Sequence, residues 1–298
     1  MNDAVAEGLL VVDKPAAMTS RAAVDRVLRW FPRGTRLGHT GTLDPLATGV
    51  LVLCLGNATR LTEYIQRMSK IYRTRLLLGA RSDTDDADGT IVPVPDAKTP
   101  DEANVRACLA EFVGAIEQVP PAYSAAKVSG KRAYDLARRG QEVTLSPRTV
   151  RIYAFDVLDY AYPHLELQVH CGKGTYIRSL ARDLGERLRC GALVETLRRT
   201  RVGPFAVEAA LTLNADAAKA RTQLLPMALA VAELPRVVLN DRELQRLRQG
   251  QSVSAAERPV EIDNDGETAI FDETGRLVAV ATFDPQRKML RPAKVLPS

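Results

Sequence analysis

Cysteine, tryptophan, lysine and long apolar runs are all scarce in this chain of 298 residues. No apolar run approaches the roughly 18 residues that cross a bilayer, and Asp3 and Glu7 stand where a secretory signal would carry basic residues. The sequence contains no Cys-x-x-Cys pair, and its histidines lack the spacing of zinc ligands. We therefore expect a cytoplasmic protein with reduced thiols, no membrane contact and no metal. The four cysteines are Cys54, Cys108, Cys171 and Cys190.

The basic residues are mainly arginine, 32 against 9 lysines, and the net charge is +5. A planar guanidinium can bind phosphate bidentately and can stack on a base, so this composition favours a polyanionic partner. Two segments concentrate the charge, 127–139 and 178–201. A solvated helix face in a protein from a GC-rich genome would look the same, so charge alone leaves nucleic-acid binding open.

The length and composition indicate a globular protein with one large and one small domain. The chain exceeds the usual size of a single domain, and 46% of its residues are hydrophobic and 26% charged. After about Ala232 the sequence changes to brief strand-like runs separated by turns at Asp265-Gly266 and Thr274-Gly275. We expect a large domain over residues 1–232 and a small β-rich domain over residues 233–298.

The most informative segment runs from Gly38 to Gly49 and leads directly into an apolar run, Val50 to Gly56, that predicts a buried strand. Asp44 precedes Pro45, whose ring disfavours helical geometry at the preceding residue. Gly41 and Gly49 can adopt positive φ or allow another molecule's backbone to approach closely. An isolated Asp-Pro pair is usually an ordinary turn. Here the carboxylate is expected at the rim of a rigid core, where reactive groups are well held.

This segment closely resembles the catalytic motif of the TruB family of tRNA pseudouridine synthases, Gly-His-x-Gly-x-Leu-Asp-Pro-x-Ala-x-Gly. Every fixed position of that motif is present. The resemblance extends over roughly the first 230 residues in consistent order. The further matching passages are 8–15, 70–72 and 172–178.

The resemblance implies a mixed α/β fold, the pseudouridine synthase fold with a largely antiparallel central sheet, and weakly a PUA-type RNA-binding domain at the C-terminus. It also implies an isomerase that converts uridine to pseudouridine at position 55 in the TΨC loop of tRNA. This isomerisation needs no redox change and no external energy, so no cofactor is expected. The partner is the T stem-loop of tRNA, with no obligate protein partner, and a monomer is the default expectation. A basic insertion at about 120–150, with a helix over Ala133 to Arg139, is expected to grip the RNA.

By the same resemblance Asp44 is the nucleophile, which could attack C1′ of the ribose or C6 of the base. Arg178 is its partner, and Tyr72 stacks on the flipped uracil and accepts the C5 proton. His39 enters the space that the flipped nucleotide leaves, and Tyr176 and Leu197 line the base pocket. Three residues are expected to support the catalytic loop: Lys14, Pro15 and Gly41.

Hydrophobic periodicity predicts the main elements around this motif. We expect strands over Gly8 to Val12, Tyr72 to Leu78 and Leu165 to Cys171, with a turn at Asp13-Lys14-Pro15. Helices are expected over Arg21 to Trp30, with Ser20 as N-cap, and over Tyr176 to Leu188. The acidic segment Ser82 to Gly89 lacks the glutamate that would complete an EF-hand loop. The family resemblance implies that it organises a loop near the catalytic cleft.

Three alternatives remain. The chain could be the guide-dependent relative that modifies RNA within a multi-protein particle, although it lacks long basic tails. It could have an accessory role as a tRNA-folding chaperone. A carboxylate-dependent glycosidase would need a second carboxylic acid across a sugar site, and the sequence offers no obvious partner.

Overall fold

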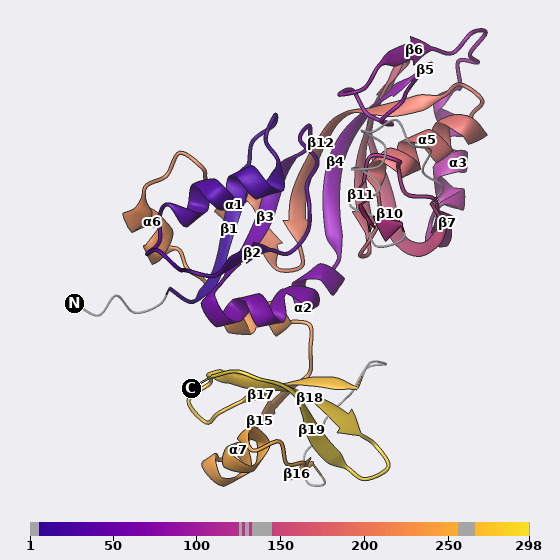
Figure 1. Cartoon of the computed structure of the whole chain (residues 1–298). Helices are drawn as coiled ribbons and strands as arrows, with labels where there is room; N and C mark the ends of the chain where they lie inside the picture. Colours follow the sequence, from indigo (N-terminus) through magenta and orange to yellow (C-terminus); the bar gives the residue numbers. More distant parts are fainter. Residues whose placement is uncertain (1–5, 125–126, 129–130, 133–144, 256–265, 298) are drawn as a thin grey trace.

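The computed structural model describes residues 6–124, 127–128, 131–132, 145–255 and 266–297. Figure 1 shows a large sheet with helices around it and a small sheet near the C-terminus below it. The strands of the large sheet are β1 (Gly8–Lys14), β2 (Leu37–His39), β3 (Thr48–Leu55), β4 (Lys70–Leu78), β7 (Gly114–Gln118), β10 (Arg148–Ala161), β11 (His164–Cys171), β12 (Ala192–Val202), β13 (Phe205–Ala206) and β14 (Leu211–Thr212). Its helices are α1 (Ser20–Leu28), α2 (Thr62–Arg67), α3 (Glu102–Glu111), α5 (Ile177–Arg187) and α6 (Ala217–Thr222), with the 3-10 helices η1 (Gly56–Leu61), η2 (Val207–Ala209) and η3 (Met227–Val231).

The large sheet is mostly antiparallel. Its strand order is β14-β1-β3-β12-β4-β11-β10-β7, with β2 paired to β3 and β13 paired to β12. Among the described pairs, β1–β14 and β3–β12 are parallel and the others are antiparallel. The expected mixed α/β fold with a largely antiparallel central sheet is therefore confirmed.

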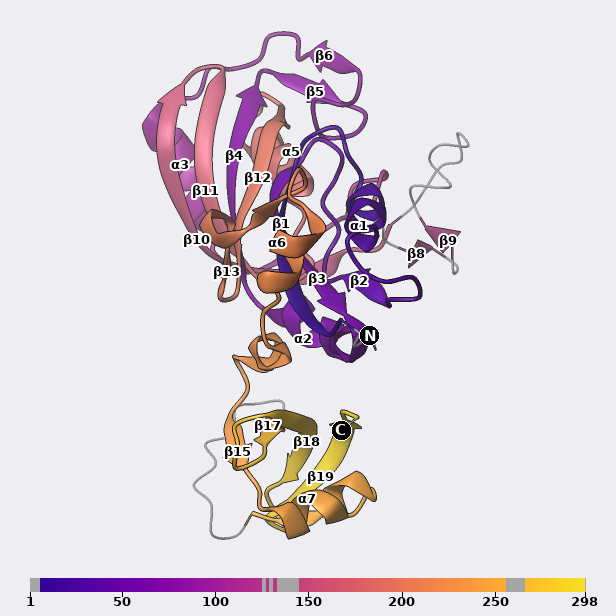
Figure 2. The ribbon, with the colours of Figure 1, turned by 90° about the vertical axis from the view of Figure 1, so that its left-hand side faces the viewer.

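Helices cover the β1–β3 half of this sheet on both faces. Leu10 and Val12 pack in the cluster that includes α1, whereas Leu9 and Val11 pack in the cluster that includes η1, α2 and η3. Because alternate residues of a strand point to opposite faces, one continuous apolar run serves two layers. On the β4–β11 half, α3 and α5 lie on one face of the sheet (Figure 2). The cluster that includes α1 also contains residues of α3 and α5, and the candidate site lies on the same face of the sheet as this cluster.

The predicted elements around the motif are present, with two local corrections. Strand β1 continues through Asp13 and Lys14, where we expected a turn, because its pairing with β3 extends to Lys14 and Gly49. The N-cap of α1 is Thr19, whose side chain accepts the Ala22 N–H, and not Ser20. Ser20 is the first residue of the helix and is almost completely buried.

The segment 178–201 is not one basic helix face. Helix α5 ends at Arg187 and the chain returns as β12, which pairs with β4 along its length. In a strand, Leu197 and Arg199 point to the same face, and both are buried. The alternative of a solvated helix face therefore does not hold for the second half of this segment.

A small sheet of five strands forms the C-terminal part of the chain, in the order β15-β17-β18-β19-β16. It contacts α2 through ion pairs of Glu267 with Arg67 and of Lys294 with Glu63. The Tyr64 hydroxyl also lies 3.3 Å from Glu267. The β-rich character expected for this region is confirmed. Its elements are β15 (Arg236–Val238), α7 (Asp241–Arg248), β16 (Val253–Ser254), β17 (Glu267–Phe271), β18 (Leu277–Asp284) and β19 (Met289–Val295).

Two short ladders complete the described structure. Strands β5 (Ala80–Ser82) and β6 (Ile91–Pro93) flank the acidic segment, and β8 (Lys127–Val128) pairs with β9 (Lys131–Arg132). The helix predicted over Ala133 to Arg139 lies outside the described residues. No helix of the described ranges is long and apolar enough to cross a membrane.

Candidate active site

The loop between β2 and β3 presents Asp44, whose side chain is 31% exposed. Helix α1 fixes this loop because the Ser20 hydroxyl accepts the Leu43 N–H at 2.8 Å and donates to the Leu43 carbonyl at 3.0 Å. On the other side of Asp44, the Ala47 N–H donates to the Asp44 carbonyl at 3.1 Å. The carboxylate therefore projects from a backbone that is held on both sides.

Lys14 supports the same loop from the end of β1. Its ammonium is completely buried and donates to the carbonyls of Pro15 at 2.8 Å, Met18 at 2.7 Å and Pro45 at 3.4 Å. Burial lowers the pKa of Lys14 to about 8, against the opposing effect of the Asp44 carboxylate. Lys14 thus links β1 to the residue that follows Asp44 and does not line the cavity described below.

Arg178, near the start of α5, forms an ion pair with Asp44, with 3.0 Å between Nη2 and Oδ2. The arginine side chain is only 5% exposed. Its guanidinium also donates to the carbonyls of Thr84 at 3.0 Å and Tyr123 at 2.8 Å. A guanidinium presents several N–H donors in a fixed plane, so these contacts determine where it lies beside Asp44.

Asp86 is a second carboxylate beside Arg178, at 3.5 Å. It is as buried as Arg178, and its other oxygen accepts bonds from the Thr84 hydroxyl at 2.6 Å and the Asp88 N–H at 3.1 Å. Burial raises the pKa of Asp86, and these bonds and Arg178 oppose that rise. The acidic segment thus organises a turn that holds Arg178 in place. No cluster of three or more metal-ligating side chains occurs in the described ranges.

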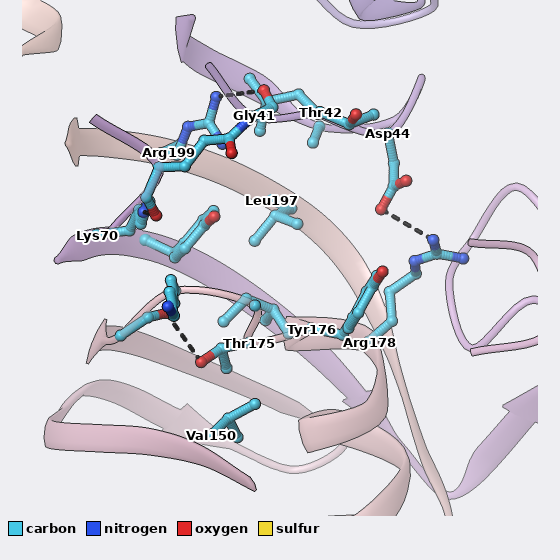
Figure 3. A pocket seen from close by; sticks show the side chains of 18 of the residues that line it. Gly41, Thr42, Asp44, Lys70, Val150, Thr175, Tyr176, Arg178, Leu197 and Arg199 are labelled. Atoms are coloured by element: carbon cyan, nitrogen blue, oxygen red, sulfur yellow. Dashed lines mark hydrogen bonds and ion pairs between the residues drawn. The ribbon is translucent and has the colours of Figure 1, made fainter. Parts of the chain in front are cut away.

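A cavity of about 490 Å³ opens beside the Asp44 carboxylate. Figure 3 shows the Asp44–Arg178 pair at one end, Lys70 and Arg199 at the other, and Leu197 between them. Tyr72, Leu197 and Tyr176 line the walls with Val150 and Ile177. The volume and the apolar and aromatic lining suit a flat ring of the size of a pyrimidine.

Tyr176 is held in the cavity wall by its neighbours. The buried side chain of Gln118 accepts the Tyr176 N–H at 2.8 Å and donates to the Tyr176 carbonyl at 3.0 Å. The Arg148 guanidinium lies over the Tyr176 ring at 4.7 Å from its centroid. Gln118 therefore fixes the Tyr176 backbone, while Arg148 covers one face of its ring.

Two cations form the end of the cavity opposite Asp44. Lys70 is 8% exposed and Arg199 is 3% exposed. Burial, together with the neighbouring Arg199, lowers the pKa of Lys70 to about 8. Burial raises the pKa of Tyr72, and the Arg199 guanidinium, which bonds to the phenol, opposes this effect.

A second hollow of about 700 Å³ shares the Asp44–Arg178 pair with this cavity. His39, at the end of β2, lines it together with Thr84, Asp86 and Tyr123. His39 therefore faces a different space from Tyr72 and Leu197. The ion pair separates the two hollows.

Of the two glycines expected to allow positive φ or a close backbone approach, Gly49 has a positive φ and Gly41 does not. The Gly41 carbonyl accepts a bond from Arg199 Nη2 at 3.3 Å. Gly49 has a φ of +103°, and a Cβ there would lie 2.1 Å from the Arg199 carbonyl oxygen. The close backbone approach is therefore made by β12 of the same chain, not by another molecule.

All nine residues singled out from the sequence lie in or directly behind the two hollows. Sequence reasoning gave no role to Gln118 or Arg199, and none to Asp86 beyond its place in the acidic segment expected to organise a loop. The alternation of Leu197 and Arg199 could have placed Arg199 beside the pocket, had the segment been interpreted as a strand. Gln118 carries no signal of its own, because a lone glutamine before Val119-Pro120 predicts nothing beyond a loop.

The comparisons with known proteins agree with this geometry. The family described as "TruB family pseudouridylate synthase (N terminal domain)" matches residues 29–177. The family described as "tRNA pseudouridylate synthase B C-terminal domain" matches residues 178–232. The two matches are contiguous and together contain every proposed site residue except Lys14 and Pro15.

Curated relatives extend the match to nearly the whole chain. The tRNA pseudouridine synthase B of Xanthomonas euvesicatoria is 44% identical over 95% of this chain and 92% of its own length. That of Cereibacter sphaeroides is 43% identical over 93% of this chain and 92% of its own length.

Among solved structures, a chain of a Cbf5-Nop10-Gar1 complex aligns with a TM-score of 0.74 and 26% identity, covering 98% of this chain and 84% of its own. A chain of an H/ACA RNP bound to a substrate RNA aligns with a TM-score of 0.75 and 24% identity. The alignment covers 99% of this chain and 86% of that one, so the two share a fold. By its family matches and its identity to curated relatives, the chain belongs to the TruB family of pseudouridylate synthases.

Proposed function

We propose that this protein converts uridine to pseudouridine at position 55 in the TΨC loop of tRNA, acting alone and without a guide RNA. The observation that carries the proposal is the partly exposed Asp44 carboxylate, paired with the buried Arg178 at the wall of a cavity of about 490 Å³. Family membership supports the reaction, and the names of the relatives support the substrate.

In the proposed reaction Asp44 is the nucleophile. Carboxylates form covalent intermediates at anomeric carbons in sugar chemistry, so we take C1′ of the ribose as the atom attacked. A bond forms between an Asp44 oxygen and C1′, and the C1′–N1 bond breaks. Arg178 pairs with the carboxylate and holds its orientation. After the base turns, C5 attacks C1′ and releases Asp44, and the C5 proton is then removed while N1 gains one.

The detached base is held by the aromatic walls of the cavity. In the proposal Tyr72 stacks on the uracil and accepts the C5 proton, while Tyr176 and Leu197 confine the ring. Because burial raises the pKa of Tyr72, the phenol needs the opposing effect of Arg199 to serve as a base. Lys14, Pro15 and Gly41 support the loop, since their bonds go to backbone and side chains behind Asp44.

The substrate nucleotide must leave the stacked T loop before it can enter the cavity, at a cost of a few kcal/mol. We place His39 in the vacated space, because it lines the hollow on the other side of the Asp44–Arg178 pair. The basic insertion at about 120–150 would then grip the stem-loop. An accessory chaperone role would use the same contacts without the chemistry.

We further propose that residues 1–232 form the catalytic domain and residues 233–298 a PUA-like domain that contacts tRNA. The protein would act in the cytoplasm as a monomer without an obligate protein partner. Action without protein partners is favoured because the sequence is 43–44% identical to relatives named tRNA pseudouridine synthase B. It is only 26% identical to the chain solved in a complex with Nop10 and Gar1.

The direct test is incubation with an unmodified tRNA transcript, followed by mapping of pseudouridine at nucleotide resolution. Pseudouridine at position 55 with protein alone is the expected result. Modification at other positions only, or only after addition of a guide RNA, would contradict the proposal.

The nucleophile is tested with Asp44→Asn. Tritium release from C5-labelled uridine in the transcript should be abolished, while tRNA affinity stays close to that of the parent protein. Retained tritium release in this variant would rule out Asp44 as the nucleophile.

A further inference from the structure

The end of the cavity opposite Asp44 holds two buried cations that are not in direct contact with a carboxylate of the described residues. Among the described residues, neither Lys70 nor Arg199 forms an ion pair. Their hydrogen bonds go to uncharged groups: the Lys70 ammonium donates to the carbonyls of Gln66 and Met68, both at 2.5 Å. Arg199 Nε donates to the Val50 carbonyl at 2.7 Å.

The two side chains also lie close enough to repel each other, because Arg199 contributes to the lowering of the pKa of Lys70. Buried charges in proteins are normally paired, and an unpaired one is costly. Arg178 at the other end of the same cavity follows that rule, with Asp44 and Asp86 beside it. The Lys70–Arg199 end does not, although both residues line open space.

One donor of Lys70 remains for a ligand, since an ammonium has three N–H bonds and two are used by backbone carbonyls. The cavity around it is lined by Tyr72 and Leu197, so a ligand there is flat and mostly apolar with an anionic edge. A phosphate group does not fit that description, because it is tetrahedral and offers no face to an aromatic wall.

We propose that Lys70 and Arg199 form an anion site that stabilises the uracil while it is detached from the ribose. The inference rests on the proposed function and adds two catalytic residues to it. When Asp44 displaces the base from C1′, the electron pair of the C1′–N1 bond stays with N1. The uracil is then an anion whose charge is shared with its two carbonyl oxygens.

A positive site at that point accelerates the reaction, because the charge develops only as the bond breaks. Interactions that strengthen from the ground state to the transition state raise the rate, whereas uniform binding does not. Fixed cations in a site without bulk water provide this stabilisation with little reorganisation. When C5 attacks C1′, the charge on the base is consumed, so the site also releases the product nucleoside.

The test compares Lys70→Met and Lys70→Gln with the parent protein in single-turnover reactions on saturating unmodified tRNA. The glutamine variant keeps N–H donors for the Gln66 and Met68 carbonyls without the charge, so it serves if the methionine variant does not fold. Both are expected to lower the rate constant by roughly 100-fold, the effect of removing one donor from an oxyanion site. The tRNA dissociation constant should stay unchanged.

Lys98→Met is the matched control, since Lys98 is exposed and lies outside both hollows. It should react at the parent rate. Failure of the parent protein to form pseudouridine at position 55 would refute the proposed function itself. A parent that reacts, together with Lys70 variants that react equally fast, would refute only the anion site. Weaker tRNA binding with an unchanged maximal rate would show that Lys70 contacts a phosphate, and would overturn the inference.

A second substrate separates charge stabilisation from a purely structural role of Lys70. Fluorine at C5 withdraws electrons, so the 5-fluorouracil anion needs less stabilisation than the uracil anion. With a transcript that carries 5-fluorouridine, the deficit of the Lys70 variants in consuming the substrate nucleoside should shrink by about tenfold. An equal deficit on both substrates would mean that Lys70 acts only through the shape of the pocket.

Discussion

Replacing Arg178 with methionine should destabilise the protein as well as inactivate it, and Asp86 is the reason. Arg178 and Asp86 are each only 5% exposed, so the substitution leaves a buried carboxylate without its cation. Breaking a buried pair in this way costs about 3–5 kcal/mol. For a domain of this size that corresponds to a fall in Tm of roughly 6–20 °C. Asp44 contributes little to this loss, because it is 31% exposed and water can solvate it.

The double-mutant cycle with Asp86→Asn isolates this contribution. Asparagine retains the oxygen that accepts the Thr84 hydroxyl and the Asp88 N–H, and it replaces the charged oxygen that faces Arg178 with a neutral amide NH2. The cost of Arg178→Met should therefore be smaller by about 1–3 kcal/mol when Asp86→Asn is already present. Urea unfolding followed by circular dichroism measures all four proteins.

The pH dependence of Arg178→Met gives an independent check. In that variant Arg178 no longer opposes the rise that burial causes in the pKa of Asp86, so the folded state binds a proton that the unfolded state releases. Relative to the parent, the free energy of unfolding of Arg178→Met should thus increase as the pH falls toward 3.8, the ordinary pKa of an aspartate. Arg182→Met, one turn further along α5 and 25% exposed, is the control and should cost about 1 kcal/mol. Costs of Arg178→Met and Asp86→Asn that simply add would refute the pairing.

Three further predictions test the scaffold and the titration of the site. Gly49→Ala should lower the free energy of unfolding, measured by urea titration, by about 2–6 kcal/mol, because the new Cβ would lie 2.1 Å from the Arg199 carbonyl oxygen and φ is +103°. Gly34→Ala is the control: its φ is +85° and its Cβ would meet no atom within 4 Å, so it tests the backbone strain alone. It should cost only about 1 kcal/mol in the same measurement. Gln118→Leu should lower the free energy of unfolding by about 2–6 kcal/mol and slow the reaction, because it leaves the N–H and the carbonyl of Tyr176 without partners. Gln118→Glu is the control, since it keeps an acceptor for the Tyr176 N–H. Equal reaction rates for Gln118→Leu and the parent would contradict the positioning of Tyr176 by Gln118. The single-turnover rate should fall as the pH rises through about 8, because Lys70, which faces Arg199, Lys173, Cys171 and Glu233, loses its proton there. The contribution of Lys70 to the free energy of unfolding should rise between that pH and its ordinary pKa of 10.5, since the unfolded state binds more protons in this range. A rate that is flat to pH 10 would contradict a catalytic charge on Lys70.

The sequence predicted the elements whose patterns are local. Strands β3, β4 and β11 follow continuous or alternating apolar runs, and α1 and α5 show helical spacing. The pairing of Asp44 with Arg178 came from the family resemblance, since 134 residues separate them and no local pattern joins them.

The residues that escaped prediction act through long-range contacts. Ser20 looked like an N-cap because a serine before a helix usually is one, and its actual bonds to Leu43 depend on how α1 packs. Strand β12 was obscured by its arginines, which are atypical of a central strand. Arg199 tolerates burial only because the Val50 and Gly41 carbonyls and the Tyr72 hydroxyl surround it, and none of these is adjacent in the chain.

Helix α2 has only six residues, and it meets both parts of the protein. Glu63 and Arg67 on its side bond to the C-terminal sheet, while the Gln66 carbonyl near its end accepts the Lys70 ammonium. Helix α2 is thus the element that stands between an RNA segment held by that sheet and a base held beside Lys70. Any linkage of the two would be reciprocal, so each contact would change the affinity of the other by the same factor.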